Sequence, residues 1–600
     1  MNETTSATLD LHDADDQARR IAAAGGRGEK VALMADWILQ VFTAYYTESR
    51  NIPAFAKQAF EDRDHATSLA LSKRRIALYS VGIEELGARL LEVVPEVASD
   101  DALWREVEGH YLPLIEGRYE ADLAFAFVNS IKRRIHQGEW QPVEYAFRGE
   151  DEVSADVSNE IVRVFPVHGA IESRVIDEIL EIPGFTRPYR DGQSDGESDA
   201  ERVAERLNRI IASRNVGAIE RIEVINAGFY RNRGGYIVGR GVTKDAVYFP
   251  LILALLNDDD GIYVDAVLCS EADAHNIFSS TLANFHVTNN YYHELSEFLQ
   301  SIMPKRPLGL HYSTIGFNHV GKVAVMNELR DELIVGNDVL ETAVGFRGTV
   351  AIGFSSPRSA YNLKVIRDEP TAQYKWGEFE GIDSVMKKYG RVHEINRTGS
   401  MLDNIIYYNL KLDRSWFDPA LLDELLADAS KTVYLRGDAV ILKYLIVQRR
   451  MTPLPVFLET ASPEDAETAI INLGYCIKNN AAANIFNKDL DARNYGVSRF
   501  IKVYLYDYDA LEPCVDVKIR SNEDRIDGEE EPPDWFFEEG VIFLPEEIEA
   551  GLMIPDRQLR RLFREVHGDL LTVSYWQRIQ DDLRTGKVPS VRIYPESREL

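Results

Sequence analysis

The length of the chain is the first constraint on its fold, because a single hydrophobic core stops growing at about 250 to 300 residues. At 600 residues, the chain is expected to fold as two to four domains. Residues 1–29 are polar and rich in aspartate, and we interpret them as a disordered tail. We expect one domain over residues 30–310 and a second over residues 311–600.

The charge balance argues against two classes of partner. Lys and Arg number 67 against 97 Asp and Glu, a formal net charge of −30 at pH 7. Sequence-independent binding to nucleic acid or to an anionic membrane requires the opposite sign, so neither partner is expected. The longest apolar runs are too short for a membrane span, and the N-terminus lacks the features of a secretory signal.

The number and spacing of the cysteines indicate the redox environment of the protein. Cys269, Cys476 and Cys514 are odd in number and far apart, which suits neither a disulfide framework nor a pair of metal ligands. The sequence therefore favours a reducing, cytoplasmic environment.

Apolar periodicity gives the expected elements of the first domain. From Lys30 to about Trp140 the apolar residues recur at helical spacing, which predicts packed helices. Residues 219–270 instead alternate β-branched and aromatic residues, which predicts a small sheet with a turn at Gly234-Gly235. The first domain is thus expected to be rich in helices, with one small sheet.

The second domain has a different order of elements. Strands are expected over Val344–Phe354 and Leu363–Arg367, joined as a hairpin, and a long helix over Pro463–Ala483. Strands followed by helices are typical of an α+β unit with two lobes, which we place at about 311–450 and 451–600.

The pattern that carries chemistry lies in the second lobe. Asp489 and Asn494 stand in the relation Asp-x4-Asn, and Asp507 follows thirteen residues later at the end of an apolar strand. Phosphoryl transfer needs a carboxylate that orients an attacking hydroxyl, and an amide and a second carboxylate that hold Mg²⁺. An ordinary acidic turn followed by a strand would also give the Asp-x4-Asn pair, so this pattern alone leaves both interpretations open.

Features upstream favour phosphoryl transfer. Gly345 and Gly348 lie in a turn before the predicted hairpin, and Lys364 lies on its second strand. Glycines allow backbone N–H groups to approach phosphate closely, and a strand holds a lysine rigidly beside it. A strand lysine is more often a solvated charge, but the order of glycine turn, strand lysine, Asp-x4-Asn and aspartate is much rarer by chance. It indicates phosphoryl-transfer machinery.

Several segments also resemble a known family. They are Asn362 to Asp368, Gln448 to Leu454, Ala481 to Phe486, Asn494 to Val497, Tyr506 to Asp509, Ser574 to Trp576, Tyr230 to Arg233 and Val238 to Arg240. Together they resemble the isocitrate dehydrogenase kinase/phosphatase family of bacteria, over nearly the whole chain.

The resemblance implies a fold and a function. It implies an α-rich regulatory domain followed by a bilobal protein-kinase-like domain. It also implies an ATP- and Mg-dependent enzyme that phosphorylates a serine of isocitrate dehydrogenase and removes the phosphate again, under the control of adenine nucleotide effectors. The sequence leaves two alternatives, a pseudokinase-like module that senses nucleotide and an ATP hydrolase without a protein substrate.

The resemblance also assigns roles by position. Asp489 would be the catalytic base, Arg493 would lie beside the transferred phosphate, and Asn494 and Asp507 would bind the metal. Arg450 to Leu454 would form the hinge beside adenine. The ATP-binding residues would be Ala343, Val344, Gly345, Phe346, Arg347, Gly348, Thr349 and Lys364.

The phosphatase role rests on a shorter match. Gly399 to Asn404 resembles a family segment linked to phosphate removal, which makes Asp403 the candidate for positioning water. Asn404 replaces a family threonine. For the helix glutamate that pairs with the strand lysine in kinases, Glu378 and Glu380 are both candidates, and the sequence does not decide between them.

Overall fold

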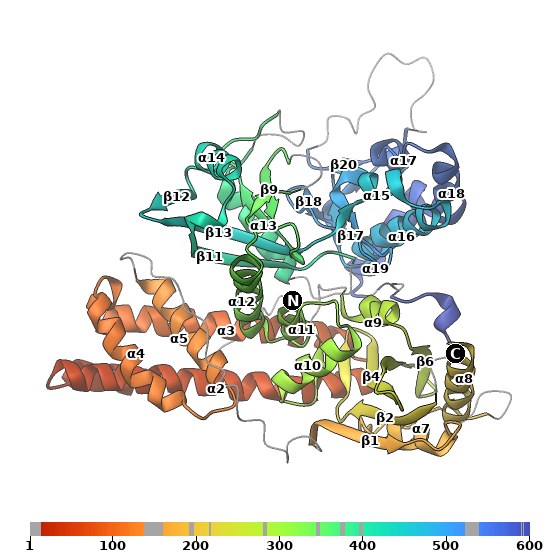
Figure 1. Ribbon diagram of the computed structural model, residues 1–600, viewed down its shortest axis with the longest axis horizontal. Coiled ribbons are helices and arrows are strands. Elements are labelled where there is room, and N and C mark those ends of the chain that lie inside the picture. Colours follow the sequence, from red (N-terminus) through yellow and green to blue (C-terminus); the bar gives the residue numbers. More distant parts are fainter. Residues whose placement is uncertain are drawn as a thin grey trace. The chain divides into compact units, whose positions relative to one another are not determined.

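The computed structural model of the chain describes residues 14–136, 160–190, 197–214, 218–279, 285–343, 348–372, 379–522 except 395–399, and 539–600 except 588, 590 and 592. The chain forms two compact units, coloured from red to green and from green to blue in Figure 1. The first contains residues 1–270 and 284–328 together with Leu600, and the second contains residues 271–283 and 329–599.

Long helices build the first part of the first unit. They are α1 (Ala14–Ala23), α2 (Arg27–Glu61), α3 (His65–Val93), α4 (Asp101–Ile115) and α5 (Ala121–Ile135). α2 packs against both α3 and α4, because its apolar residues recur at helical spacing and bury side chains such as Trp37 and Phe42. Helix α1 lies within the segment interpreted as a tail. It is ordered because Ile21 is fully buried.

An antiparallel sheet of seven strands completes this unit. The strands are β1 (Val162–Pro166), β2 (Ile219–Ile225), β3 (Phe229–Arg231), β4 (Gly234–Thr243), β5 (Tyr248–Asn257), β6 (Ile262–Leu268) and β7 (His286–Val287). Their order is β1-β2-β4-β3-β7, and β5 pairs with the other edge of β4 and with β6. The sequence predicted this sheet, although it predicted fewer strands.

The turn predicted at Gly234-Gly235 is wrong by two residues. The turn falls at Asn232 and Arg233, where Asn232 has a φ of 55°, and both glycines belong to β4. A Cβ on Gly235 would lie 3.1 Å from the ring of Phe60. This glycine therefore permits the close approach of α2 to the sheet rather than a change of chain direction.

Further helices surround the sheet and lead out of the unit. They are α7 (Ser173–Leu180), α8 (Asp199–Arg214), α10 (Tyr292–Ile302), α11 (Leu308–Thr314) and α12 (Asn318–Val335). The division between the units falls inside α12, after Glu328, rather than at residue 310 as predicted. The prolines at 304 and 307 suggested a boundary, but α11 still packs against α10.

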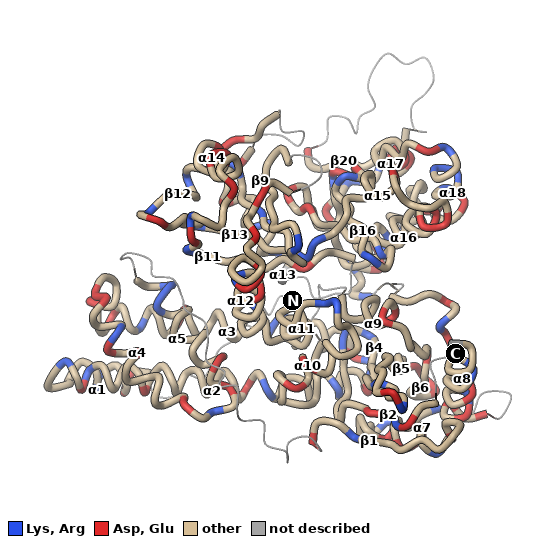
Figure 2. Tube along the Cα trace, in the orientation of Figure 1, with Lys and Arg blue, Asp and Glu red and all other residues tan. Residues whose placement is uncertain are grey.

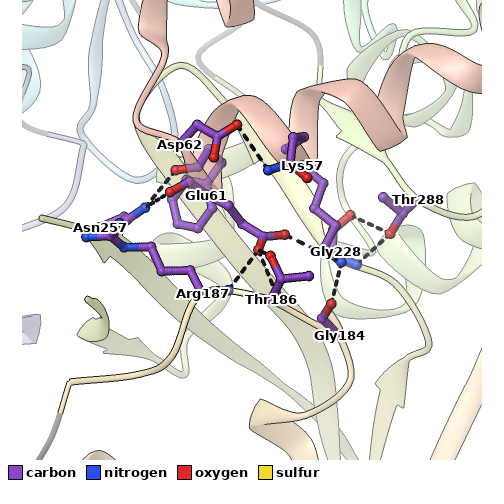
Figure 3. Close-up of polar contacts among 11 residues, drawn as sticks. Lys57, Glu61, Asp62, Gly184, Thr186, Arg187, Gly228, Asn257 and Thr288 are labelled. Carbon is purple, nitrogen blue, oxygen red and sulfur yellow. Dashed lines mark hydrogen bonds and ion pairs between the residues drawn. The ribbon is translucent and has the colours of Figure 1, made fainter.

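Hydrogen bonds among polar residues connect the end of α2 to the loop after α7 (Figure 3). The buried carboxylate of Glu61 accepts hydrogen bonds from the backbone N–H groups of Thr186, at 2.7 Å, and Arg187, at 3.0 Å, and from the Thr186 hydroxyl. The side-chain amide of Asn257 donates to the carbonyl groups of Phe60 and Glu61. The helix end is thus tied to two other segments of the first unit.

The second unit begins with α9 (Glu271–Phe278) and a sheet of six antiparallel strands. The strands are β8 (Glu341–Thr342), β9 (Ala351–Ser355), β10 (Tyr361–Ile366), β11 (Asn404–Asp413), β12 (Val433–Arg436) and β13 (Ala439–Arg449). β9 and β10 form the expected hairpin, with Lys364 opposite Gly353. Helices α13 (Ile382–Glu394) and α14 (Pro419–Asp428) belong to the same lobe.

The other lobe is mostly helical. Its helices are α15 (Leu454–Thr460), α16 (Pro463–Ala482), α17 (Ile548–Leu552), α18 (Arg557–His567) and α19 (Val573–Arg584). Its short strands are β14 (Thr452–Pro453), β15 (Ile485–Asn487), β16 (Tyr495–Val497), β17 (Val503–Leu505), β18 (Leu511–Pro513), β19 (Lys518–Ile519) and β20 (Ile542–Phe543). The predicted long helix is confirmed, and Ser462 caps it by accepting a hydrogen bond from the backbone of Asp465. Helices and antiparallel sheets together confirm the α+β prediction.

Acidic and basic residues are interspersed along both units (Figure 2). The net charge of −30 is therefore not confined to one segment. Within the described ranges, none of the helices is long and apolar enough to cross a membrane.

Candidate active site

A cavity of about 340 Å³ lies within the second unit. This volume is at the lower end of the range for small-molecule sites, about 300 to 1,000 Å³. Eight residues singled out from the sequence line it, namely Ala343, Gly348, Thr349, Lys364, Asp489, Arg493, Asn494 and Asp507. Residues more than 140 positions apart in the chain therefore face one space.

Strands β8 and β9, which precede and follow the glycine-containing segment in the sequence, pair with each other. Ala343, Gly348 and Thr349 line the cavity. The predicted contacts of Val344, Gly345, Phe346 and Arg347 lie outside the described residues. Met451 and Pro453 of the expected hinge also line the cavity.

Lys364 reaches into the cavity from the middle of β10. Its ammonium donates to the backbone carbonyl of Tyr506 at 3.0 Å, and it lies 4.9 Å from the centre of the Tyr506 ring. Burial lowers the pKa of Lys364, while the nearby carboxylates of Asp507 and Asp509 act against this shift. The lysine is thus a rigidly held cation beside two carboxylates.

Asp489 and Asn494 are held together by the loop between β15 and β16. The Asn494 side-chain amide donates to the backbone carbonyl of Asp489 at 2.9 Å, and the Asn487 side-chain amide donates to the same carbonyl at 2.7 Å. Because the Asn494 nitrogen is used in this way, its side-chain oxygen is the atom left for a cation. The loop thereby fixes the spacing that the sequence suggested.

Arg493 lines the cavity, but its guanidinium is bound to Asp491. The Nε and Nη2 atoms of Arg493 lie 2.9 and 2.5 Å from one carboxylate oxygen of Asp491, and its backbone N–H donates to the other oxygen. This interaction raises the pKa of Arg493, so the guanidinium stays charged. Asp491 is buried, and the sequence analysis did not single it out.

Two carboxylates follow β17. Asp507 and Asp509 both line the cavity, on either side of the buried Tyr508. Burial and the neighbouring charge of Asp507 raise the pKa of Asp509 to about 7. The sequence analysis assigned a role only to Asp507, although the Asp-Tyr-Asp spacing allows both carboxylates to face the same side.

Asp403 does not belong to the cavity lining, although its neighbour Leu402 does. The backbone N–H of Leu402 donates to the carbonyl of Leu505 at 2.9 Å, and the Tyr508 hydroxyl donates to the Leu402 carbonyl. Asp403 is therefore held beside the segment that carries Asp507. Asn404 begins β11 and is buried.

Of the two candidates for the helix glutamate, the structure describes only Glu380. Glu380 is exposed, and it accepts a hydrogen bond from Ser384 one turn further along the chain. Glu378 lies outside the described residues. From α13, Val385 and Tyr389 line the cavity, and the sequence analysis missed both.

The residues present fit a nucleotide with its magnesium. A lysine, an amide oxygen and carboxylates face one cavity, which suits phosphate groups and a hard cation. In the described parts of the chain, no three His, Cys, Asp or Glu side chains are arranged to hold a metal ion. The amide oxygen and carboxylates of the cavity nevertheless suit Mg²⁺, because proteins commonly bind this ion by one or two carboxylates together with substrate phosphates.

Comparison with known proteins identifies the family. Residues 35–335 match the regulatory domain, and residues 338–596 the kinase domain, of isocitrate dehydrogenase kinase/phosphatase (AceK). The isocitrate dehydrogenase kinase/phosphatase of Rhodopseudomonas palustris strain HaA2 is 48% identical, over 98% of this chain and 94% of its own. The protein of that name from Anaeromyxobacter sp. strain Fw109-5 is 30% identical, over 93% of this chain and 96% of its own.

The matches extend through both units and include the cavity with its lysine, amide and carboxylates. An identity of 48% over nearly the full length of both proteins confirms the family resemblance predicted from the sequence. The chain belongs to the isocitrate dehydrogenase kinase/phosphatase family.

Proposed function

We propose that this protein phosphorylates isocitrate dehydrogenase on a serine, using ATP and Mg²⁺, and that it also removes the phosphate. The observation that supports this most is the convergence of Lys364, Asp489, Asn494 and Asp507 on one cavity. A module that only sensed nucleotide would have no use for the proton acceptor Asp489 in addition to the phosphate and metal ligands.

Each residue has a distinct task in the proposed transfer. Bound nucleotide supplies the phosphoryl group, and its magnesium neutralises phosphate charge. Lys364 binds phosphate oxygens, and the oxygens of Asn494 and Asp507 hold the metal ion. Asp489 orients the serine hydroxyl and accepts its proton as the new bond from the serine oxygen to the γ-phosphorus forms. The bond from the γ-phosphorus to the bridging oxygen breaks, and ADP leaves with that oxygen. The hydrogen bond from Asn494 to the Asp489 carbonyl anchors the backbone that carries this carboxylate.

Arg493 lines the cavity, and Asp491 holds its guanidinium. We propose that Arg493 attracts the transferred phosphate from this fixed position. Asp403 would position water for phosphate removal, from a place beside the nucleotide cavity.

Two further parts of the proposal concern regulation and location. We propose that adenine nucleotides act as effectors, as the match to the family's regulatory domain suggests. We also propose a cytoplasmic location, which agrees with three buried cysteines that form no disulfide.

The test is transfer of labelled phosphate. The protein is incubated with γ-labelled ATP, Mg²⁺ and purified bacterial isocitrate dehydrogenase, and the phosphorylated residue is mapped. Asp489→Ala should lower the rate by about 10²-fold or more while ATP affinity changes little. Release of phosphate without transfer to protein would instead identify an ATP hydrolase, and ATP binding without turnover a pseudokinase.

A further inference from the structure

In the described part of the chain, no helix glutamate pairs with Lys364. In protein kinases the strand lysine pairs with a helix glutamate, and this pair must be in place for activity. Among the described residues, Lys364 makes no ion pair, and its one hydrogen bond goes to the Tyr506 carbonyl. The aromatic ring of Tyr389, from α13, lies 5.9 Å from its ammonium.

Tyr389 also contacts the metal-binding aspartate. Its hydroxyl donates to Oδ1 of Asp507 at 3.0 Å, and its side chain is only 1% exposed. Its ring packs against that of Tyr508, with the centres 5.1 Å apart.

The hydrogen bonds of Asp507 leave one oxygen for a cation. The backbone N–H of Tyr508 donates to Oδ1 at 3.1 Å, and the Tyr389 hydroxyl donates to the same atom. Within the described residues, Oδ2 accepts no hydrogen bond. The residue before Tyr389 on α13 adds a second connection, since the Lys388 ammonium donates to the backbone carbonyl of Asp509 at 2.8 Å.

We propose that Tyr389 is a positioning residue, which fixes Asp507 for the metal ion through its hydroxyl and packs its ring beside Lys364. The inference rests on the proposed function, because it assumes that Asp507 binds Mg²⁺. Hydrogen bonds to a metal ligand orient it, and their loss typically lowers metal affinity or activity by about 10- to 100-fold. Helix α13 thereby contacts both the lysine and the proposed metal ligand through one side chain.

The test is Tyr389→Phe, which removes the hydroxyl and keeps the ring. Calorimetry measures the dissociation constants of ADP with Mg²⁺ and of ADP with a chelator. We expect the variant to bind Mg·ADP about tenfold more weakly while metal-free ADP binding stays within about twofold. The Mg²⁺ concentration for half-maximal phosphorylation should rise by a similar factor. The ratio of the two constants does not depend on the fraction of protein that is folded.

Tyr444→Phe is the matched control. Tyr444 also directs its hydroxyl to an aspartate of α13, Asp383, at 3.4 Å, but it does not line the cavity. This variant should bind both forms of ADP as the wild type does. An unchanged ratio in Tyr389→Phe, with wild-type protein that binds Mg·ADP, would overturn the role of Tyr389 alone. Wild-type protein that does not bind Mg·ADP would overturn the proposed function as well.

Discussion

Asn494 links the two predicted tasks of the catalytic loop. Its amide nitrogen anchors the backbone of Asp489, and its amide oxygen is the proposed metal ligand. Asn494→Ala should therefore lower the phosphorylation rate by about 10²-fold and weaken the binding of Mg·ATP, whereas metal-free ATP should bind nearly as before. Rate assays and calorimetry measure the two effects.

Asn472→Ala is a suitable control for that change. Asn472 makes the same type of bond, from its side-chain amide to the Ile501 carbonyl at 2.9 Å, and it does not line the cavity. Asn472→Ala should leave the phosphorylation rate and the Mg²⁺ dependence of ATP binding unchanged. Equal effects of the two substitutions would show that Asn494 acts only on the stability of the loop.

The buried Asp491 holds Arg493 and caps the short helix over Ala492–Asn494. Asp491→Ala should lower the free energy of unfolding by about 1 to 2 kcal/mol and also lower the phosphorylation rate, because Arg493 loses its fixed position. Asp413 caps a similar short helix, Arg414–Trp416, away from the cavity. Asp413→Ala should cost less stability, because Asp413 is exposed, and it should keep the full rate. A normal rate in Asp491→Ala would remove Arg493 from the mechanism.

Sequence reasoning located some residues of the site and missed others for a physical reason. Asp489, Asn494 and Lys364 lie on short, locally constrained segments, so spacing along the chain reflects spacing in the molecule. Tyr389 belongs to a helix whose direction depends on packing, and a tyrosine at a helical core position is indistinguishable in sequence from an ordinary core residue. Its contact with Asp507, 118 positions away, could only come from the structure.

At the scale of elements, Glu61 is the clearest test of what holds the first unit together (Figure 3). Burial alone would raise the pKa of Glu61, but hydrogen bonds from Thr186 and Arg187 outweigh it and lower the pKa below its ordinary value of 4.5. Glu61→Gln should destabilise the contact between α2 and the 186–187 loop by about 1 to 3 kcal/mol at pH 7. Hydrogen exchange of the Thr186 and Arg187 amides measures this local loss.

The pH dependence of that effect follows from the direction of the pKa shift. Because the folded state lowers the pKa of Glu61, its ionised form stabilises the fold above pH 4.5, and this is lost as the pH falls through the lower folded pKa. The difference between wild type and Glu61→Gln should therefore shrink below that pH. Glu106→Gln, which loses an exposed ion pair with Arg27, should change little at any pH.

Elements with local signals were predicted well, and those that depend on contacts were not. The helix α16 begins with Ser462-Pro463, a cap followed by a residue suited to the first turn, and both its ends were found. Gly235 was misread because a glycine that gives a turn and a glycine that admits Phe60 look alike in sequence. The boundary inside α12 was missed because no composition change marks the point where a continuous helix passes from one unit to the next.

At the scale of the whole molecule, two opposite reactions are proposed for one site, and Asp403 is the residue that should separate them. It lies beside the segment that carries Asp507 but not in the lining of the nucleotide cavity. In the proposed mechanism, Asp489 is the proton acceptor of the kinase direction, whereas phosphate removal needs a group that positions water. Asp403→Ala should therefore slow phosphate release from phosphorylated isocitrate dehydrogenase by about 10²-fold and leave the kinase rate within about threefold.

Companion variants show whether this separation reflects chemistry. Asp403→Asn keeps the size of the side chain and can still accept a hydrogen bond from water, but it cannot take a proton. A phosphatase loss in Asp403→Asn as large as in Asp403→Ala would indicate that the carboxylate takes the proton, and a smaller loss would indicate that it only orients water. Asp438→Ala removes an exposed carboxylate between β12 and β13 and should affect neither activity. Equal loss of both activities in Asp403→Ala would mean that Asp403 supports the β11 and β17 segments rather than the reaction, since the adjacent Leu402 joins them through the Leu505 carbonyl.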